Sequence, residues 1–269
     1  MKWDYHIVSD YSDSDLTLPQ IFNQARSRGL SAIAITDRDR VEGALKACAA
    51  AEDLEVMLGI EVSAQDDQGR PVSVLGYAFD PQARALRHLC QMTLVRQNEL
   101  ALWQIEQLDQ AGYPITVSEV RRKLGHGQCL YSQHIMDVLT EKGIADGLWG
   151  SFYRRYFGTG GLCQRSIRYP TVKEAIEAIH QDHGIAVLAH PGLSGCIDQI
   201  WKWAEMGLDG VETGYSAQSF SQVMRIHEIA MALGLIETAG SGNRGRYGDP
   251  IPIGTVSWKG ERLCRPMKN

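Results

Sequence analysis

Short β-rich runs alternate along this chain with longer stretches of helical periodicity, and this alternation constrains the fold more than any other feature. The runs share apolar and β-branched residues and lie at 31–36, 56–62, 72–77, 185–190, 210–213 and 236–241. Helical patterns are expected between them, at roughly 16–29, 40–52, 171–183, 195–206 and 217–233. Such alternation predicts a mostly parallel sheet, open or closed into a barrel, and therefore an α/β fold.

Polar residues stand where these runs end. They are Asp37, Glu61, His190, Glu212 and Ser241. Because parallel α/β folds assemble their sites at the carboxyl edge of the sheet, a functional pocket is expected there. Taken singly, each residue also has a plainer interpretation: His190 as a packed histidine, Asp37 as the cap of the next helix, and Glu212 as a solvated residue at a strand edge.

Residues 80–169 interrupt the rhythm. Residues 82–112 resemble one long or broken helix, 118–124 and 132–143 also have helical patterns, and 144–157 are rich in aromatic residues. We interpret this region as a helical insertion that lies over the strand ends as a cap. The aromatic residues alternate with arginines at helical spacing, which favours a packing core over a base-stacking platform.

Composition limits the kinds of ligand the protein is expected to bind and the cellular compartment in which it is expected. The net charge of −5 provides no broad basic face, which argues against long duplex nucleic acid, while a small phosphorylated ligand is compatible with it. No apolar run reaches the ~20 residues that span a bilayer, and the first residues lack the apolar stretch of a signal peptide. The 6 cysteines include no C-x-x-C pair and are expected to be reduced thiols. We therefore expect a cytoplasmic protein without a membrane partner.

Six short motifs follow one another along the chain. They read D-Y-H-I-V-S, S-D, T-D-R-D, G-I-E, A-H-P and G-S-G-N-R-G, at residues 4–9, 12–13, 36–39, 59–61, 189–191 and 240–245. In this order they resemble the signature of the PHP family, the polymerase and histidinol phosphatase domain. That family has D-L-H-x-H-S-x-x-S-D-G, T-D-H-D, G-x-E, A-H-P and G-S-D-x-H-G at these places. The resemblance is strongest to its metal-dependent phosphoesterases that act on nucleotides and short nucleic acids.

The resemblance covers nearly the whole chain and implies a particular architecture. The resemblance implies a distorted (β/α)7 barrel that carries a helical insertion and binds up to three divalent metal ions. On this basis we expect a PHP-like barrel of residues 1–79 and 170–269, with the helical insertion at 80–169.

Alignment by eye places nine metal-ligand positions of the family on this chain. Four keep a residue type that binds metal: His6, Asp13, Glu61 and His190. Five do not: Val8, Arg38, Ser73, Gly242 and Arg244. Each Zn²⁺, Mn²⁺ or Fe²⁺ ion needs about four to six nitrogen or oxygen ligands. The sequence therefore argues against a trinuclear cluster and predicts either no metal or one weakly bound Mn²⁺, Zn²⁺ or Fe²⁺ ion.

The arginines at two of these positions bring a permanent positive charge to places where a metal ion would have been bound. We expect Arg38 and Arg244 to neutralise Asp13, Asp37 and Glu61. Guanidinium groups also recognise phosphate through paired hydrogen bonds. The predicted anion-binding residues are Arg38, Arg244 and Arg246, supported by Asp37 and Asn243.

The function expected from these observations is that of a divergent PHP-family phosphoesterase homologue, or pseudoenzyme. It would bind a phosphorylated small molecule or a nucleotide with little or no hydrolysis, and no residue is assigned a catalytic role. Two alternatives stay open: an active phosphoesterase with a single-metal site, and a non-catalytic regulatory or scaffold protein. If the chain is active, the reaction expected is metal-dependent hydrolysis of a phosphate ester.

Overall fold

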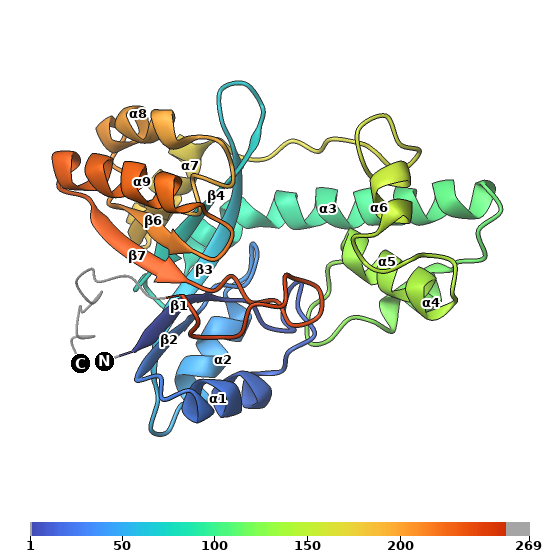
Figure 1. Cartoon of the computed structure of the whole chain (residues 1–269), viewed down its shortest axis with the longest axis horizontal. Coiled ribbons are helices and arrows are strands. Elements are labelled where there is room, and N and C mark those ends of the chain that lie inside the picture. Colours follow the sequence, from blue (N-terminus) through green and yellow to red (C-terminus); the bar gives the residue numbers. More distant parts are fainter. Residues whose placement is uncertain (1, 257–269) are drawn as a thin grey trace. The chain divides into compact units, whose positions relative to one another are not determined.

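A computed structural model describes residues 2–256 of the chain (Figure 1). These residues form two compact units. Unit 1 comprises the described residues up to Gln91 and from Tyr169 onward, and unit 2 comprises Met92–Arg168.

Unit 1 is built on a seven-stranded sheet. Its strands are β1 (Trp3–Ile7), β2 (Ala32–Ile35), β3 (Glu55–Gln65), β4 (Pro71–Tyr77), β5 (Ile185–Leu188), β6 (Gly210–Tyr215) and β7 (Ile236–Gly240), in that spatial order. Neighbouring strands are parallel except around β4, which runs antiparallel to both β3 and β5. Just beyond β7, Asn243 bridges in parallel to Ile7 of β1, which brings the two edges of the sheet together. The predicted α/β barrel is confirmed.

The helices of unit 1 alternate with these strands. They are α1 (Leu18–Ser27), α2 (Glu42–Ala50), α7 (Val172–Gln181), α8 (Ile200–Glu205) and α9 (Phe220–Leu233), with the 3₁₀ helix η1 (Ile197–Gln199) before α8. α1 buries one face at the spacing expected from its sequence: Leu18, Ile21, Phe22 and Ala25. Successive side chains of a strand point to opposite faces of the sheet. In β2, Ile33 and Ile35 point to the face that packs against the helices. Ala32 and Ala34 instead join a second core with aromatic residues of β1 and β4.

Unit 2 is helical. It contains the continuation of α3 (Arg84–Gln110), which starts in unit 1, and also α4 (Val117–Arg121), α5 (Ser132–Glu141) and α6 (Ser151–Tyr156). It has a core of its own, in which Leu108, Ile135, Leu139 and Phe152 are buried. Aromatic rings reinforce this core, since the Phe152 ring lies 4.4 Å from that of Tyr156.

The described part of the chain contains no helix that is both long and apolar enough to cross a membrane. The cysteines in this part carry free thiols: Cys48, Cys90, Cys129, Cys163 and Cys196. Cys264 lies outside the described residues.

Candidate functional site

Side chains at or after the ends of three strands meet at Glu61 of β3. Its carboxylate lies 3.6 Å from Nη2 of Arg38, which follows β2, and 3.6 Å from Nε2 of His6 in β1. Nε2 of His190, which follows β5, lies 3.8 Å away. The parallel bridge between Arg38 and Glu61 aligns the two backbones. The structure thus brings together four of the nine positions that were aligned with metal ligands of the family: His6, Arg38, Glu61 and His190.

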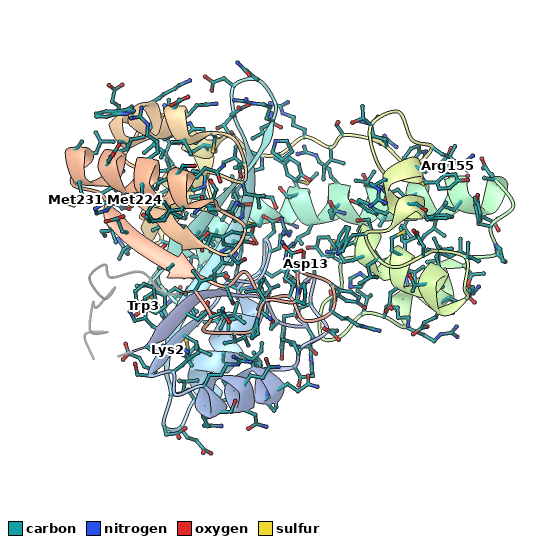
Figure 2. The ribbon with its side chains drawn as sticks, viewed as in Figure 1. Lys2, Trp3, Asp13, Arg155, Met224 and Met231 are labelled. Carbon is teal, nitrogen blue, oxygen red and sulfur yellow. The ribbon has the colours of Figure 1, made fainter. Side chains whose placement is uncertain are left out.

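Asp13 lies between two arginines of the predicted site. Its Oδ2 atom is 3.2 Å from Nε of Arg38 and 3.3 Å from Nη1 of Arg244. Asp13, labelled in Figure 2, is only 1% exposed, whereas the arginine side chains are 22% and 27% exposed. Burial raises the pKa of Asp13, but Arg38 and Arg244 outweigh it and lower that pKa. The carboxylate is therefore held ionised by two partly accessible guanidinium groups.

The same balance holds at Glu61. Burial raises its pKa, while Arg38, His190 and His6 together lower it well below the usual range. Glu61 and Asp13 are therefore both anionic near neutral pH, and Arg38 contacts each of them.

Glu212 of β6 holds the two histidines from the interior of the unit. Its Oε1 atom lies 2.9 Å from Nδ1 of His6, and Oε2 accepts a hydrogen bond of 3.0 Å from the backbone N–H of His190. Burial lowers the pKa of His6, but Glu212 and Glu61 overcome this effect and raise it to about 10. The interpretation of Glu212 as a solvated residue is wrong, because it is fully buried. Its position at the end of a β-rich run was the signal that pointed to the site.

Tyr215, at the end of β6, is a site residue that the sequence did not indicate. Its ring lies 4.8 Å from that of His190 and 5.6 Å from that of His6. The two imidazoles stack at 5.8 Å with an interplanar angle of 17°. His190 also adopts a φ of 29°, which is strained for a residue other than glycine.

Asp37 does not join the arginines. It accepts hydrogen bonds from the backbone N–H of Ser9 at 2.7 Å and from the hydroxyl groups of Ser9 and Ser12. Burial raises its pKa to about 7. Within residues 2–256 no ion pair links Asp37 to Arg38 or Arg244, so that part of the expected neutralisation is wrong. Nor does Asp37 cap α2, whose N-cap is Val41.

The loop after β7 is shaped by Asn243. The Asn243 amide donates to the carbonyl of Ile251 at 2.5 Å and accepts from the N–H of Gly245 at 3.1 Å. Arg246 contacts Asp15 through its backbone N–H at 2.9 Å and through Nε at 3.3 Å. Asn243 therefore supports the loop that carries Arg244. Arg246 is bound to Asp15 and not to Asp13, the partner of Arg244.

The remaining altered positions lie in or beside the sheet. Val8 is fully buried, and its N–H donates to the carbonyl of Asn243. Gly242 has a φ of 64°, and a Cβ atom there would clash with the ring of Tyr215. Ser73 of β4 pairs with Ser63, which shares a face of β3 with Glu61 through strand alternation. Among the described residues, no group of three or more His, Cys, Asp or Glu side chains is placed to hold a metal ion.

Comparison with known proteins gives consistent results. The PHP domain model matches residues 4–216. The chain is 36% identical to a phosphoribosyl 1,2-cyclic phosphate 1,2-diphosphodiesterase of Eggerthella lenta, over 93% of this chain and 97% of that protein. It is 26% identical to a 3′,5′-nucleoside bisphosphate phosphatase of Chromobacterium violaceum, over 98% of each chain.

A solved structure agrees in fold. A Bifidobacterium adolescentis protein assigned as a metal-dependent phosphoesterase superposes with a TM-score of 0.85 at 27% identity, over 94% of this chain and 91% of that one.

Proposed function

Since the chain belongs to the PHP domain family, we propose that it is a divergent member that binds a phosphorylated small molecule or nucleotide through arginines, with little or no hydrolysis. Two relatives are named for substrates of this kind, a cyclic ribosyl phosphate and a nucleoside bisphosphate. The observation that carries the proposal is the convergence of Arg38 and Arg244 on the buried carboxylate of Asp13.

The donor set at this edge does not fit the metal cluster of the family. PHP phosphoesterases are metal-dependent, and a bound metal ion supplies an activated water. Here arginine offers no lone pair, and its charge repels a cation. Asp13 and Glu61, which would be the anionic ligands, already have guanidinium partners at 3.2–3.6 Å. A metal ion would have to displace those partners before either carboxylate could bind it.

The same geometry suits an anion. A guanidinium carries five N–H donors in a planar fork that matches the oxygen atoms of a phosphate. The side chains of Arg38 and Arg244 stay partly exposed although the carboxylates beneath them are buried. Asp13 and Glu61 would orient the two guanidinium groups, and a phosphate would approach from the exposed side.

Thermal unfolding with inorganic phosphate or ribose 5-phosphate tests the proposal. At roughly 100 times its Kd, a ligand that binds only the folded state raises stability by about 2.7 kcal/mol. Arg244→Lys keeps the positive charge but loses the paired hydrogen bonds, so it should weaken binding about tenfold or more. Arg26→Lys is the matched control, since Arg26 pairs with Asp53 on the surface. Absence of stabilisation in the wild type, or equal effects of the two variants, would contradict the proposal.

One observation favours an active enzyme as the second candidate. The Glu61 carboxylate lies 3.6 Å from Nε2 of His6 and 3.8 Å from Nε2 of His190. These three side chains would be the donors for a single metal ion, although their arrangement in the described residues is not that of a metal site and they would have to move to bind one. Phosphoesterase turnover that a chelator abolishes would identify this function. Silence in both the binding and the turnover assays would favour the scaffold alternative.

A further inference from the structure

We propose that the outer face of α9 is a self-association surface, which packs antiparallel against the same helix of a second copy of this chain. The surface comprises Phe220, Met224, Arg225, Glu228 and Met231. These residues are not part of the arginine cluster at the sheet edge, so the inference does not depend on the function proposed for that cluster.

Two apolar faces run along α9. Ile226 and Ile229 lie on one face and are buried in the main core of unit 1. On the other face Phe220, Met224 and Met231 are 80%, 36% and 67% exposed, and the two methionines are labelled in Figure 2. At about 3.6 residues per turn, these three side chains fall within about 40° of one another around the helix axis. A surface helix usually presents polar residues on its outer face, so a continuous apolar face there indicates a partner.

The charged residues of α9 indicate which partner fits. Besides His227, the helix carries one cation, Arg225, and one carboxylate, Glu228. A two-fold axis between residues 225 and 226, perpendicular to the helix, places Phe220 level with Met231 of the second copy. Arg225 is then about 3 Å along the helix axis from Glu228 of the second copy, at a rise of about 1.5 Å per residue. The symmetry forms each contact twice, which is the self-complementarity that a two-fold interface requires.

The helix ends favour the same arrangement. Antiparallel packing places the partly positive N-terminus of one helix beside the partly negative C-terminus of the other. A parallel pair would place Arg225 beside Arg225 and Glu228 beside Glu228, with like ends together. The antiparallel pair is therefore the arrangement that satisfies both the charges and the helix dipoles.

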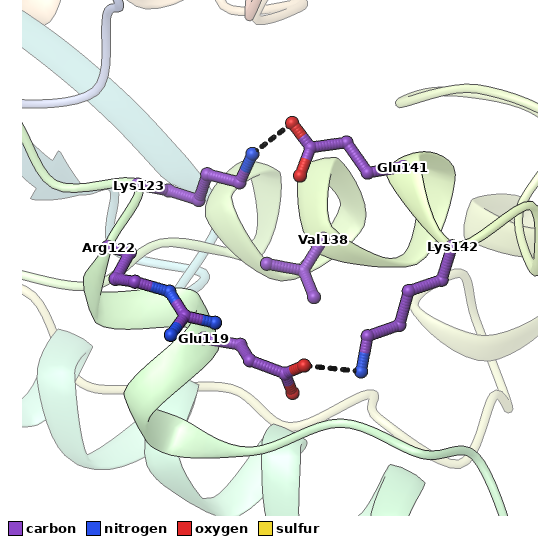
Figure 3. Close-up of a pocket in the computed structure, with 6 residues that line it drawn as sticks. All are labelled: Glu119, Arg122, Lys123, Val138, Glu141 and Lys142. Carbon is purple, nitrogen blue, oxygen red and sulfur yellow. Dashed lines mark ion pairs between the residues drawn. The ribbon is translucent and has the colours of Figure 1, made fainter.

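The ion pair within α9 is loose enough for its members to change partner. Nη1 of Arg225 lies 3.9 Å from Glu228 of its own chain, and the two side chains are 58% and 66% exposed. A tight pair of unit 2 provides the contrast: Lys142 and Glu119, in the wall of a cavity of about 180 Å³, lie 2.7 Å apart (Figure 3). An exposed pair such as that of α9 contributes little to stability, so both of its side chains are available to a second copy.

Sedimentation velocity of the full chain over a range of concentrations tests the surface. Three apolar side chains and one ion pair from each copy make a contact smaller than the roughly 1,200 Å² of a standard interface, so we expect a Kd on the order of 100 µM. The wild type should be monomeric near about 5 µM and mostly dimeric near about 500 µM. Met231→Glu places a carboxylate in the apolar contact and should raise the Kd tenfold or more. Met92→Glu is the matched control, because Met92 is 50% exposed but lies on α3.

Charge reversal tests the antiparallel register. Arg225→Glu alone and Glu228→Arg alone each bring like charges together across the two-fold axis, so each should weaken the dimer about tenfold. In an equal mixture of the two variants, opposite charges meet again in both contacts. Mixed dimers should therefore form with close to wild-type affinity.

Three results would overturn the proposal. A wild type that stays monomeric at every concentration would mean that a second copy is not what covers this face. Dimers that Met231→Glu weakens no more than Met92→Glu would place the contact elsewhere on the chain. Charge-reversed variants that do not complement each other in the mixture would rule out the antiparallel pairing of α9.

Discussion

Asp13 shows at the scale of single residues how the site is balanced. Burial removes the hydration of the Asp13 carboxylate, which costs free energy. The guanidinium groups of Arg38 and Arg244 offset this cost through opposite charge and hydrogen bonds. The nine aligned ligand positions of the family include Asp13, Glu61, Arg38 and Arg244, so the sequence predicted which residues meet here. The partners of each residue could not be predicted: Asp37 is bound by two serines, and Glu212 is the carboxylate that holds the histidines. Such pairings depend on side-chain directions that a one-dimensional pattern does not contain.

Loss of Arg38 should be costly for folding. Arg38→Met would leave Asp13 and Glu61, both buried, without one of their cations, and breaking a buried pair in this way costs about 3 kcal/mol. Urea unfolding would measure the change in free energy. Arg26→Met, which removes an exposed partner of Asp53, should cost less than about 1 kcal/mol. Equal losses for both variants would show that the cluster contributes nothing to stability.

Asp39 gives a prediction for pH. It is buried with a φ of 56°, and it accepts the N–H of Ser63 at 2.8 Å. Burial raises its pKa to about 7, so the folded protein binds a proton that the unfolded chain releases near pH 4. Its contribution to stability is therefore complete below about pH 4 and is lost as the pH rises towards 7.

Asp39→Asn removes that loss, and asparagine tolerates a positive φ. The variant should gain on the order of 2 kcal/mol over the wild type at pH 8, and little or nothing at pH 4. Melting temperatures across this range would measure the difference. Both proteins should still lose some stability as the pH rises, because the pKa of Asp37 is also about 7. A difference that does not change with pH would refute the assignment.

At the scale of secondary-structure elements, most of unit 1 was predictable. Hydrophobic periodicity located β2 to β7 and all five α-helices of the unit, and capping residues such as Thr171 before α7 account for helix starts. The antiparallel course of β4 was not predicted, because a strand of buried residues has the same pattern in either direction. The φ of 29° at His190 was likewise not predicted, because the pattern of residue types does not contain it.

The loop after β7 should not tolerate a side chain at Gly242. Its φ of 64° disfavours other residues, and a Cβ atom there would clash with the Tyr215 ring at the end of β6. Gly242→Ala is expected to lower the free energy of unfolding by about 2 kcal/mol. In a Tyr215→Ala background the same change should cost about half as much, because the clash is gone and only the backbone strain remains. Costs that add independently would argue against a close contact between loop and strand.

At the scale of the whole molecule, the chain has the fold of its family, and the proposal concerns the chemistry at the edge of the sheet. The alternation of strands and helices predicted the barrel, and the ordered motifs predicted the family. The separate core of unit 2 explains why residues 80–169 departed from the rhythm, since helices there pack on one another. The proposed exchange of metal ions for arginines is the central claim, and it concerns charge rather than architecture.

Metal content tests that claim most directly. The protein would be soaked in Mn²⁺ and Zn²⁺, desalted and measured by mass spectrometry, beside a Val8→His, Arg38→His double variant that restores two ligand types. The wild type should retain far less than one ion per chain, on the order of a tenth, and the double variant should retain more. About one ion or more per wild-type chain would contradict the replacement of the metal site by arginines.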